Sequence, residues 1–376
     1  MNQNPFVTSG YVSSEYFCDR EQESAEVIMD VEGRNNKVLI SPRRMGKTGL
    51  ILHCFNQPEL RDNYYCFFID IYPTLNLSDF VVLLGNKICE VLKPKGKNAI
   101  EAFCRIVRSL EFRISFDSLG QLEASFGLGD IKDPQRTLDE IFSYINSSEK
   151  RCVVAIDEFQ QISKYPETHT EALLRTHVQH CTNASFIFAG SQRHMLQNMF
   201  FSASKPFYHS ASVMSLKPIP LEKYSEFVIR HFNEAGKQIA AKDIEYVYEL
   251  FEGHTWYMQS VFYLAYYMTI DVCTCEIIQK AIQKKLDDNG EIYEAIYYGI
   301  PEKQRELLKA LACEGKFDKI QSGVFIKKYN LPSASSVQSA AKRLLDNDLI
   351  TIENNGLYSI SDRFLSMWLR QRLGRG

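Results

Sequence analysis

The distribution of apolar and polar positions divides the chain into three zones. From Lys37 to about Leu216, short apolar runs alternate with helical patterns, which is typical of βαβ units around a mostly parallel sheet. Parallel strands that helices cover on both faces are apolar throughout. Five runs have this character: Lys37–Ile40, Tyr65–Ile71, Cys152–Ile156, Ser185–Ala189 and Val213–Leu216. The first zone is therefore predicted to be an α/β domain.

A period-two segment interrupts the first zone. Residues 111–116 alternate between apolar and polar, and the alternation resumes over 122–126 after a short turn that contains glycine. This pattern predicts a β-hairpin inserted between helices. The helix expected next, Thr137–Ser147, carries Asp139 and Glu140 in its first turn, where solvated carboxylates favour the helix dipole, so neither is given a catalytic role.

The other two zones are predicted to be smaller domains. From Lys217 to about Ile300 only helical periodicity is found, and its helix Trp256–Ile270 has six aromatic residues that we expect to form core. From Pro301 onward, three helices precede two strands around Asn354-Asn355-Gly356, a typical hairpin turn. This order predicts a winged helix, with helices Glu302–Cys313, Ser322–Tyr329 and a third that has Ser333 or Ser335 as N-cap and ends at Leu345, and strands Asp348–Glu353 and Leu357–Ser361.

Length and composition add limits to this picture. The 376 residues are enough for two or three domains, which we place at 1–216, 217–300 and 301–376. Hydrophobic residues make up 45% and charged residues 24%, which is a globular balance. No apolar run reaches about eighteen residues and no secretory signal is seen, so no membrane segment is expected. Ten scattered cysteines indicate a reduced, cytoplasmic protein.

A candidate phosphate loop directly follows the first predicted strand. The segment Ser41-Pro42-Arg43-Arg44-Met45-Gly46-Lys47-Thr48, with Gly49 beside it, is close to the P-loop pattern G-x-x-x-x-G-K-[ST]. Gly46 allows backbone N–H groups to face phosphate oxygens, and the following helix adds its positive end. Lys47 is expected to contact the β- and γ-phosphates of ATP, and the Thr48 hydroxyl is expected to bind Mg²⁺.

Ser41 stands where the pattern has its first glycine. If that position requires a positive φ, a residue other than glycine costs about 1 kcal/mol or slightly more. Ser41 therefore weakens the match without removing it. On the loop alone, a strand-turn-helix that contains glycine, lysine and threonine by chance is the competing interpretation.

The acidic end of another strand makes that alternative less favourable. The strand Cys152–Ile156 is followed by Asp157, placed to bind magnesium, and Glu158, placed to polarise the attacking water as a general base. The next strand is followed by Gly190 and by Ser191 and Gln192, either of which could sense the γ-phosphate. Together with Lys47 and Thr48, this pattern predicts a site for ATP and Mg²⁺.

At these residues the chain resembles the archaeal-type ATPase family, a branch of P-loop proteins close to the AAA+ and signal-transduction NTPases. Its most specific shared motif is the double-arginine loop Pro42–Thr48. The resemblance covers most of the chain, through Phe17–Glu21, Gly190-Ser191, Leu216–Pro218, Gly253–Met258 and Ser361–Arg370. It implies an AAA+-like P-loop core, a helical lid and a C-terminal winged helix, with Phe17 and Arg20 beside the adenine. Thr255 departs from the family pattern, where proline is usual.

The charge of the third zone bears on DNA binding. Residues 301–376 contain thirteen lysines and arginines and eight acidic residues, a net charge of +5, whereas the rest of the chain carries −8. However, the predicted recognition helix has only Lys342 and Arg343, near its C-terminal end, although such helices read bases from their N-terminal part. DNA binding through 301–376 is therefore less favoured than a protein partner or self-association.

The sequence as a whole favours an ATP-binding conformational switch with slow hydrolysis. Closing of the lid over ATP would change how the winged helix is presented. Arg43 or Arg44 could contact phosphate or a neighbouring subunit, and the residues alone do not separate these roles. The two alternatives are a DNA-binding regulator or initiator, and a nucleotide-locked scaffold with negligible turnover.

Overall fold

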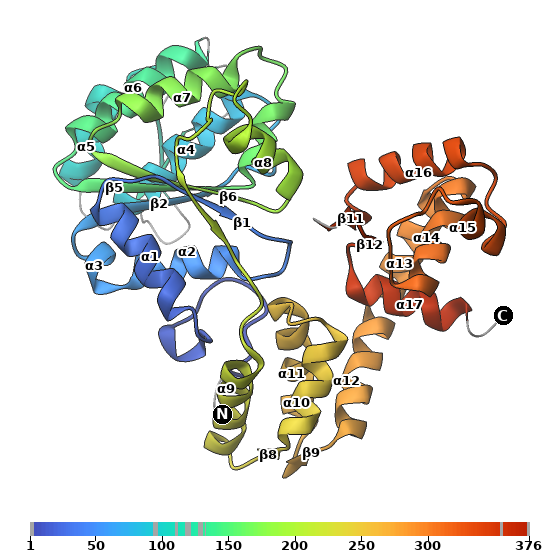
Figure 1. The fold of residues 1–376 in the computed structure, drawn as a ribbon. Helices are drawn as coiled ribbons and strands as arrows, with labels where there is room; N and C mark the ends of the chain where they lie inside the picture. Colours follow the sequence, from blue (N-terminus) through green and yellow to red (C-terminus); the bar gives the residue numbers. More distant parts are fainter. Residues whose placement is uncertain are drawn as a thin grey trace. The chain divides into compact units, whose positions relative to one another are not determined.

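The computed structural model describes residues 4–92, 97–109, 112–116, 122–126, 131, 133–353 and 356–373. The chain divides into two compact units (Figure 1). The first unit contains Val7–Tyr224 and the short segment His254–Trp256. The second contains the first six residues, Ser225–Gly253 and Tyr257–Gly376.

A five-stranded parallel sheet forms the centre of the first unit, which confirms the predicted α/β fold class. Its strand order is β2-β5-β6-β1-β7, and every neighbouring pair is parallel. Each predicted strand lies within one residue of an observed one: β1 (Lys37–Ile40), β2 (Tyr64–Asp70), β5 (Arg151–Asp157), β6 (Ala184–Gly190) and β7 (Ser212–Ser215). The carboxyl ends of β1, β6 and β5 are therefore adjacent, and they are the strand ends that carry the candidate chemistry.

Helices cover both faces of this sheet, so the central strands are buried on both sides (Figure 1). Val153 and Ala155 of β5 pack with one set of helices, whereas Val154 and Ile156 pack with the other. One face is covered by α1 (Glu21–Glu32), α2 (Lys47–Asn56) and α3 (Pro58–Arg61). The other is covered by α4 (Leu77–Leu92), α5 (Lys97–Ile106), α6 (Pro134–Ser147), α7 (Thr170–His180) and α8 (Arg193–Phe201). Among its described residues this unit also has two short 3₁₀ helices, Ser14–Tyr16 and Phe159–Lys164.

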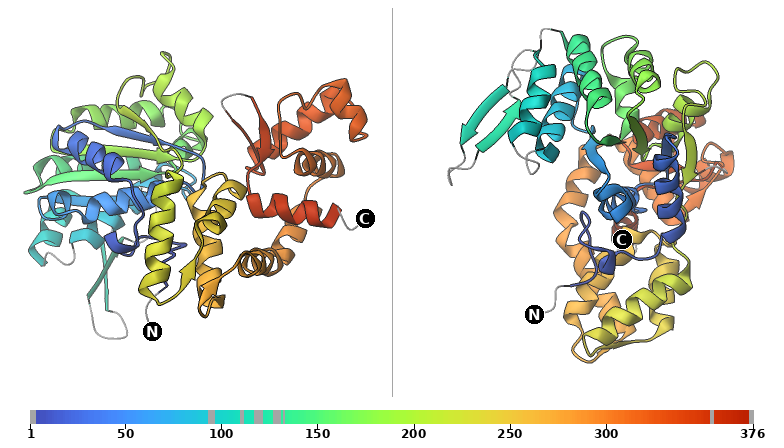
Figure 2. Two further views of the ribbon diagram at one scale, coloured as in Figure 1. Left: turned by 60° about the horizontal axis from the view of Figure 1, so that its bottom comes forward. Right: turned by 90° about the vertical axis from the view of Figure 1, so that its left-hand side faces the viewer.

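The predicted β-hairpin is confirmed. Strands β3 (Phe112–Phe116) and β4 (Leu122–Phe126) pair antiparallel, and the ribbon extends away from the sheet (Figure 2). The turn between them lies outside the described residues.

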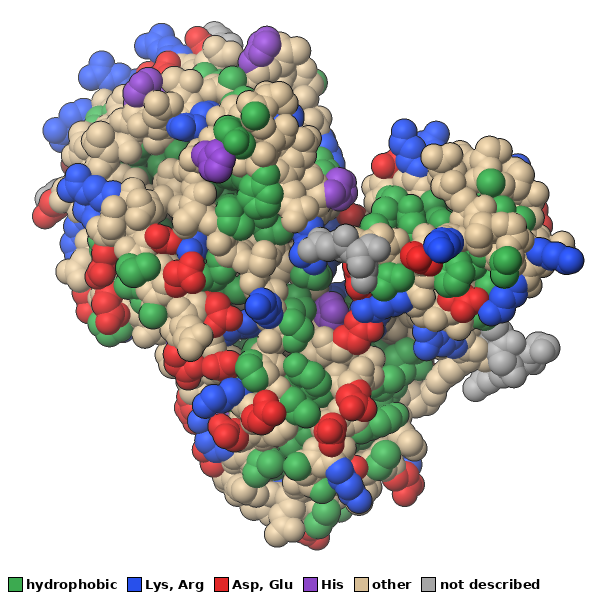
Figure 3. All heavy atoms as spheres, viewed as in Figure 1, with side chains coloured by type: hydrophobic (Ala, Val, Ile, Leu, Met, Phe, Trp, Pro, Cys, Tyr) green, Lys and Arg blue, Asp and Glu red, His purple; other side chains and the backbone are tan. Residues whose placement is uncertain are grey.

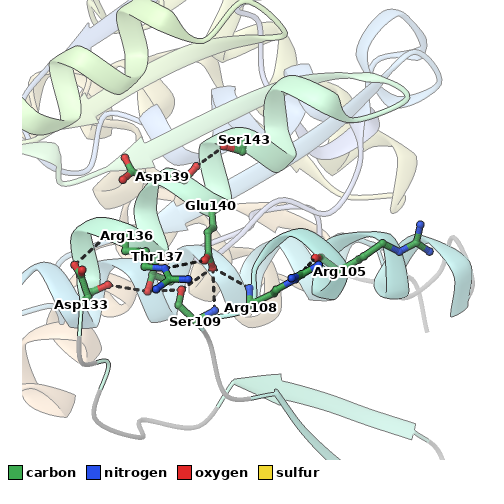
Figure 4. A network of polar contacts seen from close by, with 9 residues as sticks. All are labelled: Arg105, Arg108, Ser109, Asp133, Arg136, Thr137, Asp139, Glu140 and Ser143. Atoms are coloured by element: carbon green, nitrogen blue, oxygen red, sulfur yellow. Dashed lines mark hydrogen bonds and ion pairs between the residues drawn. The ribbon is translucent and has the colours of Figure 1, made fainter.

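The interpretation of Glu140 as a solvated first-turn acid is wrong. Helix α6 begins at Pro134, three residues earlier than predicted, because Asp133 caps it by accepting a hydrogen bond from the Arg136 amide (3.0 Å). Glu140 therefore lies in the second turn, with a side chain 17% exposed. Its Oε2 accepts hydrogen bonds from the backbone amide (2.9 Å) and the hydroxyl (2.7 Å) of Ser109 and from the Arg108 amide (2.8 Å) (Figure 4). Glu140 thus fixes the end of the segment that leads into the hairpin.

We expect the stabilisation from Glu140 to depend on pH. Burial raises the pKa of Glu140. The hydrogen bonds from Ser109, the Arg108 amide and Arg136 together lower it by more than burial raises it, so the pKa lies below its ordinary value. Such a carboxylate stabilises the fold above the pKa of the unfolded chain, and this contribution is lost as pH falls through the folded-state pKa.

Glu140→Gln is expected to lower the free energy of unfolding by about 1–2 kcal/mol at pH 7. The difference should shrink below about pH 4.3, the ordinary pKa of glutamate. Denaturant titration at pH 7 and in mild acid measures it, and a difference independent of pH would contradict this account.

The second unit begins with helices, as predicted. They are α9 (Leu221–Glu234, whose first turn belongs to the first unit), α10 (Ala241–Leu250), α11 (Thr255–Met268), α12 (Cys275–Asp288) and α13 (Gly290–Gly299). The expectation of helical structure only is corrected by one parallel pair, β8 (Gln238–Ile239) and β9 (Val272–Cys273). Two-residue strands are too short to show a period of two. Of the aromatic residues of α11, Tyr257, Phe262 and Tyr266 are buried, whereas Tyr267 is 62% exposed.

The winged helix is confirmed, with one additional strand. Its helices are α14 (Glu302–Glu314), α15 (Gly323–Lys328), α16 (Ala334–Asp346) and α17 (Arg363–Leu373). Its antiparallel sheet has the order β10-β12-β11, formed by Lys316–Phe317, Tyr358–Ile360 and Ile350–Ile352. Ser333, one of the two serines considered, is the N-cap of α16 and accepts from the Ser336 amide (3.3 Å). Asn354 and Asn355 of the predicted turn lie outside the described residues. Within the described ranges, no helix is both long enough and apolar enough to cross a membrane.

Candidate nucleotide site

The candidate phosphate loop connects β1 to α2, as the sequence predicts (Figure 1). Gly46 has φ +90° and Arg44 has φ +68°, and these are the left-handed residues of the loop. Ser41 is 1% exposed and is not left-handed, so it does not need the backbone freedom of glycine. The departure at Ser41 therefore carries no backbone cost. The cost falls instead on Arg44, where a left-handed non-glycine residue is unfavourable by about 1–2 kcal/mol.

The Lys47 ammonium lies buried inside the loop. It donates to the Ser41 carbonyl (3.2 Å), the Ser41 hydroxyl (3.4 Å) and the Pro42 carbonyl (3.3 Å), and the residue is 7% exposed. Burial lowers the pKa of Lys47, and the nearby charges of Asp157 and Glu158 only partly counteract this. Among the ion pairs of the described residues, none involves Lys47. A buried cation bound only by neutral oxygens is complementary to an anionic ligand.

The loop and the acidic strand end meet at Thr48. Its hydroxyl donates to Oδ2 of Asp157 at 2.7 Å, and Asp157 is 6% exposed. The other carboxylate oxygen, Oδ1, accepts from the backbone amide of Glu158 at 2.9 Å. The structure thus brings together the two residues predicted to bind metal, although they lie 109 positions apart in the sequence.

The predicted catalytic carboxylate belongs to a polar network at the ends of β5 and β6. Glu158 is left-handed, with φ +55°, and its Oε2 accepts from the Ser191 hydroxyl (3.0 Å) and from the Gln160 amide. Ser191 accepts in turn from Nε of Arg43 (3.2 Å). A Cβ at Gly190 would lie 2.0 Å from Oε1 of Gln160, so any other residue there would displace the Gln160 amide from its contact with Glu158. Gln160 was not singled out from the sequence, where its only signal is its position two residues after the acid.

The residues predicted to lie beside the adenine occupy two different environments. The Phe17 ring stacks on His53, with ring centroids 4.1 Å apart, and its Cε2 would lie 3.5 Å from a Cβ at Gly49. Arg20 is 4% exposed, pairs with Glu23 (2.6 Å), and donates to the Lys217 carbonyl (2.7 Å) and the Met45 carbonyl (3.5 Å). Phe17 thus lies against the start of α2, whereas the Arg20 guanidinium connects the phosphate loop to the chain after β7. Gln192 is the N-cap residue of α8.

A parallel sheet with a phosphate loop after β1 and an acidic pair at the carboxyl end of β5 defines the class of P-loop ATPases. Residues 17–261 match the family described as "ATPase domain predominantly from Archaea". This match covers more than half of the chain, so the chain belongs to that family. Residues 291–371 match the family described as "Probable winged helix domain".

Solved structures with a similar fold include archaeal proteins. A Walker-type ATPase of Pyrococcus abyssi has a TM-score of 0.67 and 18% identity, over 97% of this chain and 99% of that one. The ORC2 protein of Aeropyrum pernix, solved as ADPNP-ADP complexes, has a TM-score of 0.61 and 11% identity, over 99% of both chains. The ORC1 protein of the same organism, in complex with DNA, has a TM-score of 0.53 and 11% identity, over 96% of this chain and 94% of that one. Such identities indicate a shared fold only. No curated protein gives a significant match.

Proposed function

We propose that this chain binds ATP with magnesium in the loop Ser41–Thr48 and hydrolyses it slowly. The observation that carries this proposal is the buried Lys47 ammonium, whose hydrogen bonds within the described part of the chain all go to neutral oxygens of Ser41 and Pro42. Desolvation of an ammonium without an anionic partner is unfavourable. A phosphate in the loop would supply that partner, and Met45, Gly46 and Gly49 would present backbone to it.

The oxygen atoms around Thr48 fit magnesium. Its hydroxyl and Oδ2 of Asp157 are hard oxygen donors 2.7 Å apart, which is the type of ligand that magnesium prefers. The described residues contain no cluster of three or more acidic, histidine or cysteine side chains suited to a metal. This agrees with magnesium sites that use one or two protein ligands plus substrate phosphates. When bound, the ion would neutralise charge on the β- and γ-phosphates.

The remaining polar residues support hydrolysis. Glu158 would accept the proton of the attacking water, as a general base. Ser191 donates to Glu158 and accepts from Arg43. A γ-phosphate that attracts Arg43 or Ser191 would therefore change the hydrogen bonds of Glu158. This is our basis for assigning Ser191, rather than Gln192, as the γ-phosphate sensor. Phe17 is proposed to contact the base of the nucleotide, and Arg20 to position Met45 of the loop.

The metal assignment is tested by replacing Thr48 with valine, which keeps the shape of the side chain but removes the hydroxyl. Calorimetric titration with ATP in excess magnesium and in excess EDTA should show about tenfold tighter binding with magnesium for the unchanged chain. Thr48→Val should bind ATP equally in both conditions. The matched control is Thr176→Val, on the exposed face of α7, which should keep the metal effect. An undiminished metal effect in Thr48→Val would exclude Thr48 as a ligand.

We further propose that the chain is a cytoplasmic conformational switch. All ten cysteines are free thiols, which suits a reducing compartment. ATP would favour one arrangement of the core (1–216), the lid (217–300) and the winged helix (301–376), and ADP another, by differential affinity. The readout would be a protein partner or a second copy of the chain.

DNA binding through the winged helix is the less favoured alternative. Lys342 and Arg343 are exposed near the C-terminal end of α16, whereas the exposed residues of its N-terminal half are uncharged. On the face drawn in Figure 3, basic side chains are interspersed with acidic and hydrophobic ones. Duplex binding that weakens steeply with salt would support this alternative.

A further inference from the structure

Trp256 contacts the phosphate loop at its left-handed arginine. The Arg44 guanidinium lies over the Trp256 ring, 4.2 Å from the ring centroid, and the Trp256 amide donates to the Arg44 carbonyl at 3.1 Å. The indole Nε1 donates to the Thr8 carbonyl at 2.8 Å, which fixes the plane of the ring. All three residues belong to the first unit, to which Trp256 returns from a distant part of the sequence. Both the backbone and the side chain of Arg44 are therefore bound by one residue.

This double contact holds Arg44, the non-glycine residue of the loop with a left-handed backbone. Arg44 has φ +68°, a region that a non-glycine residue enters only when its surroundings fix it there. Gly46, two residues later, has φ +90° and leads directly to Lys47. Fixing Arg44 therefore fixes the path of the backbone whose amides would face the phosphates. The stacked guanidinium also points to different roles for the two arginines, because Arg43 contacts Ser191 instead.

We propose that Trp256 is a positioning residue of the nucleotide site, which preforms the phosphate loop by binding Arg44 through its ring and its backbone. The part of the proposal that concerns affinity rests on the proposed ATP binding. The part that concerns loop geometry does not. In this proposal Trp256 acts through Arg44 and not on the nucleotide itself.

The turn before Trp256 is fixed by the winged helix, within the second unit. Glu252 is left-handed, with φ +52°, and its Oε2 pairs with Arg363 and with Lys316, each at 2.7 Å. On the other side, the Tyr257 hydroxyl accepts from the Arg363 amide at 3.0 Å and donates to the Ser361 carbonyl at 3.3 Å. The backbone from Glu252 to Tyr257 thus carries residues that contact the winged helix on either side of Trp256, the residue that contacts Arg44.

The loop geometry is tested first, in the nucleotide-free full chain. Amide hydrogen exchange of the peptides that cover residues 41–46 is expected to become at least about tenfold faster in Trp256→Ala, because the loop opens more often when the ring contact with Arg44 is lost and only the backbone hydrogen bond remains. Trp256→Phe keeps a ring under Arg44 and is expected to recover most of the protection. The matched control is Trp368→Phe, in α17. Its amides at residues 41–46 should exchange at the rate of the unchanged chain. Unchanged exchange in Trp256→Ala would overturn the proposal.

Affinity is tested second, by a double-mutant cycle of Trp256→Ala and Arg44→Ala with Mg·ATP as ligand. Each single variant is expected to bind about tenfold more weakly, and the double variant no more weakly than either single one. If the affinity loss of the double variant equalled the product of the two single losses, the two residues would act independently, and the proposed role of Arg44 as the intermediary would be overturned. The chain has two tryptophans, so Trp256 is the one that remains in Trp368→Phe. When this variant is titrated with Mg·ATP, the fluorescence of Trp256 should change, with the same midpoint concentration as in calorimetry. Absence of ATP binding by the unchanged chain would sink the proposed function, while the exchange result would still decide the role of Trp256.

Discussion

Replacing Lys47 with alanine is expected to raise the dissociation constant of Mg·ATP by about a hundredfold or more. Removing one partner of a desolvated charge pair costs roughly 2–5 kcal/mol, and each 1.4 kcal/mol is about a factor of ten. Among the described residues the Lys47 ammonium donates to oxygens of Ser41 and Pro42, and neither residue could supply the positive charge that the substitution removes. Isothermal titration calorimetry of both proteins measures the difference.

The same substitution has an expected effect on stability that separates lost binding from lost folding. Burial lowers the pKa of Lys47, which means that the folded chain without ligand disfavours the charged form. A base with a lowered pKa destabilises the fold at pH values where it is charged. Lys47→Ala should therefore unfold at a temperature no lower than the unchanged chain when nucleotide is absent. Lys284→Ala, which removes an exposed lysine of α12, is the control and should bind ATP normally. Retained binding in Lys47→Ala would refute the site.

Replacing Glu158 with glutamine is expected to slow ATP hydrolysis by about 10²–10⁴-fold, the usual contribution of a general base. Glutamine has the same shape, and its side-chain oxygen still accepts from Ser191 and Gln160, but it cannot take a proton from water. Binding of Mg·ATP should change little, because Glu158 is not proposed to contact the nucleotide. Single-turnover hydrolysis together with calorimetry separates the two effects.

Glu140→Gln is the matched control for this experiment. It removes a carboxylate of the same unit whose hydrogen bonds stabilise the segment before the hairpin, so it should lower stability and leave turnover per folded chain unchanged. If Glu158→Gln hydrolysed ATP at the original rate, another group would have to activate the water. Glu158 would then be only a partner of Ser191.

Much of the fold could be predicted from local sequence patterns. The parallel strands were found within one residue because burial on both faces makes their whole length apolar, as in Val153–Ile156. Their order could not be found, because no local pattern states which strands pair. In the sheet, β6 lies between β1 and β5, although β6 follows both of them in the sequence. Strands β8, β9 and β10 were missed because two residues show no period.

The candidate site shows the same limit. Residue type and position in the motif are enough to predict chemical roles for Lys47, Thr48, Asp157 and Glu158. The contact of Thr48 with Asp157 follows once both are placed at carboxyl ends of one parallel sheet. The loop pattern puts a backbone cost at Ser41 if that position is left-handed, but the φ values place the cost at Arg44. Contacts made by residues far apart in sequence, such as Arg44 with Trp256, leave no pattern that one chain can reveal.

The most direct test of the account is single-turnover hydrolysis by the purified full chain. The chain, in excess over labelled ATP and with magnesium present, is quenched at intervals, and the nucleotide bound to it is separated by chromatography. ATP is expected to be recovered bound at early times and to be converted slowly and completely to bound ADP. ATP that stays bound and intact over hours would contradict hydrolysis and favour the nucleotide-locked scaffold. No bound nucleotide at any time would contradict the central claim itself.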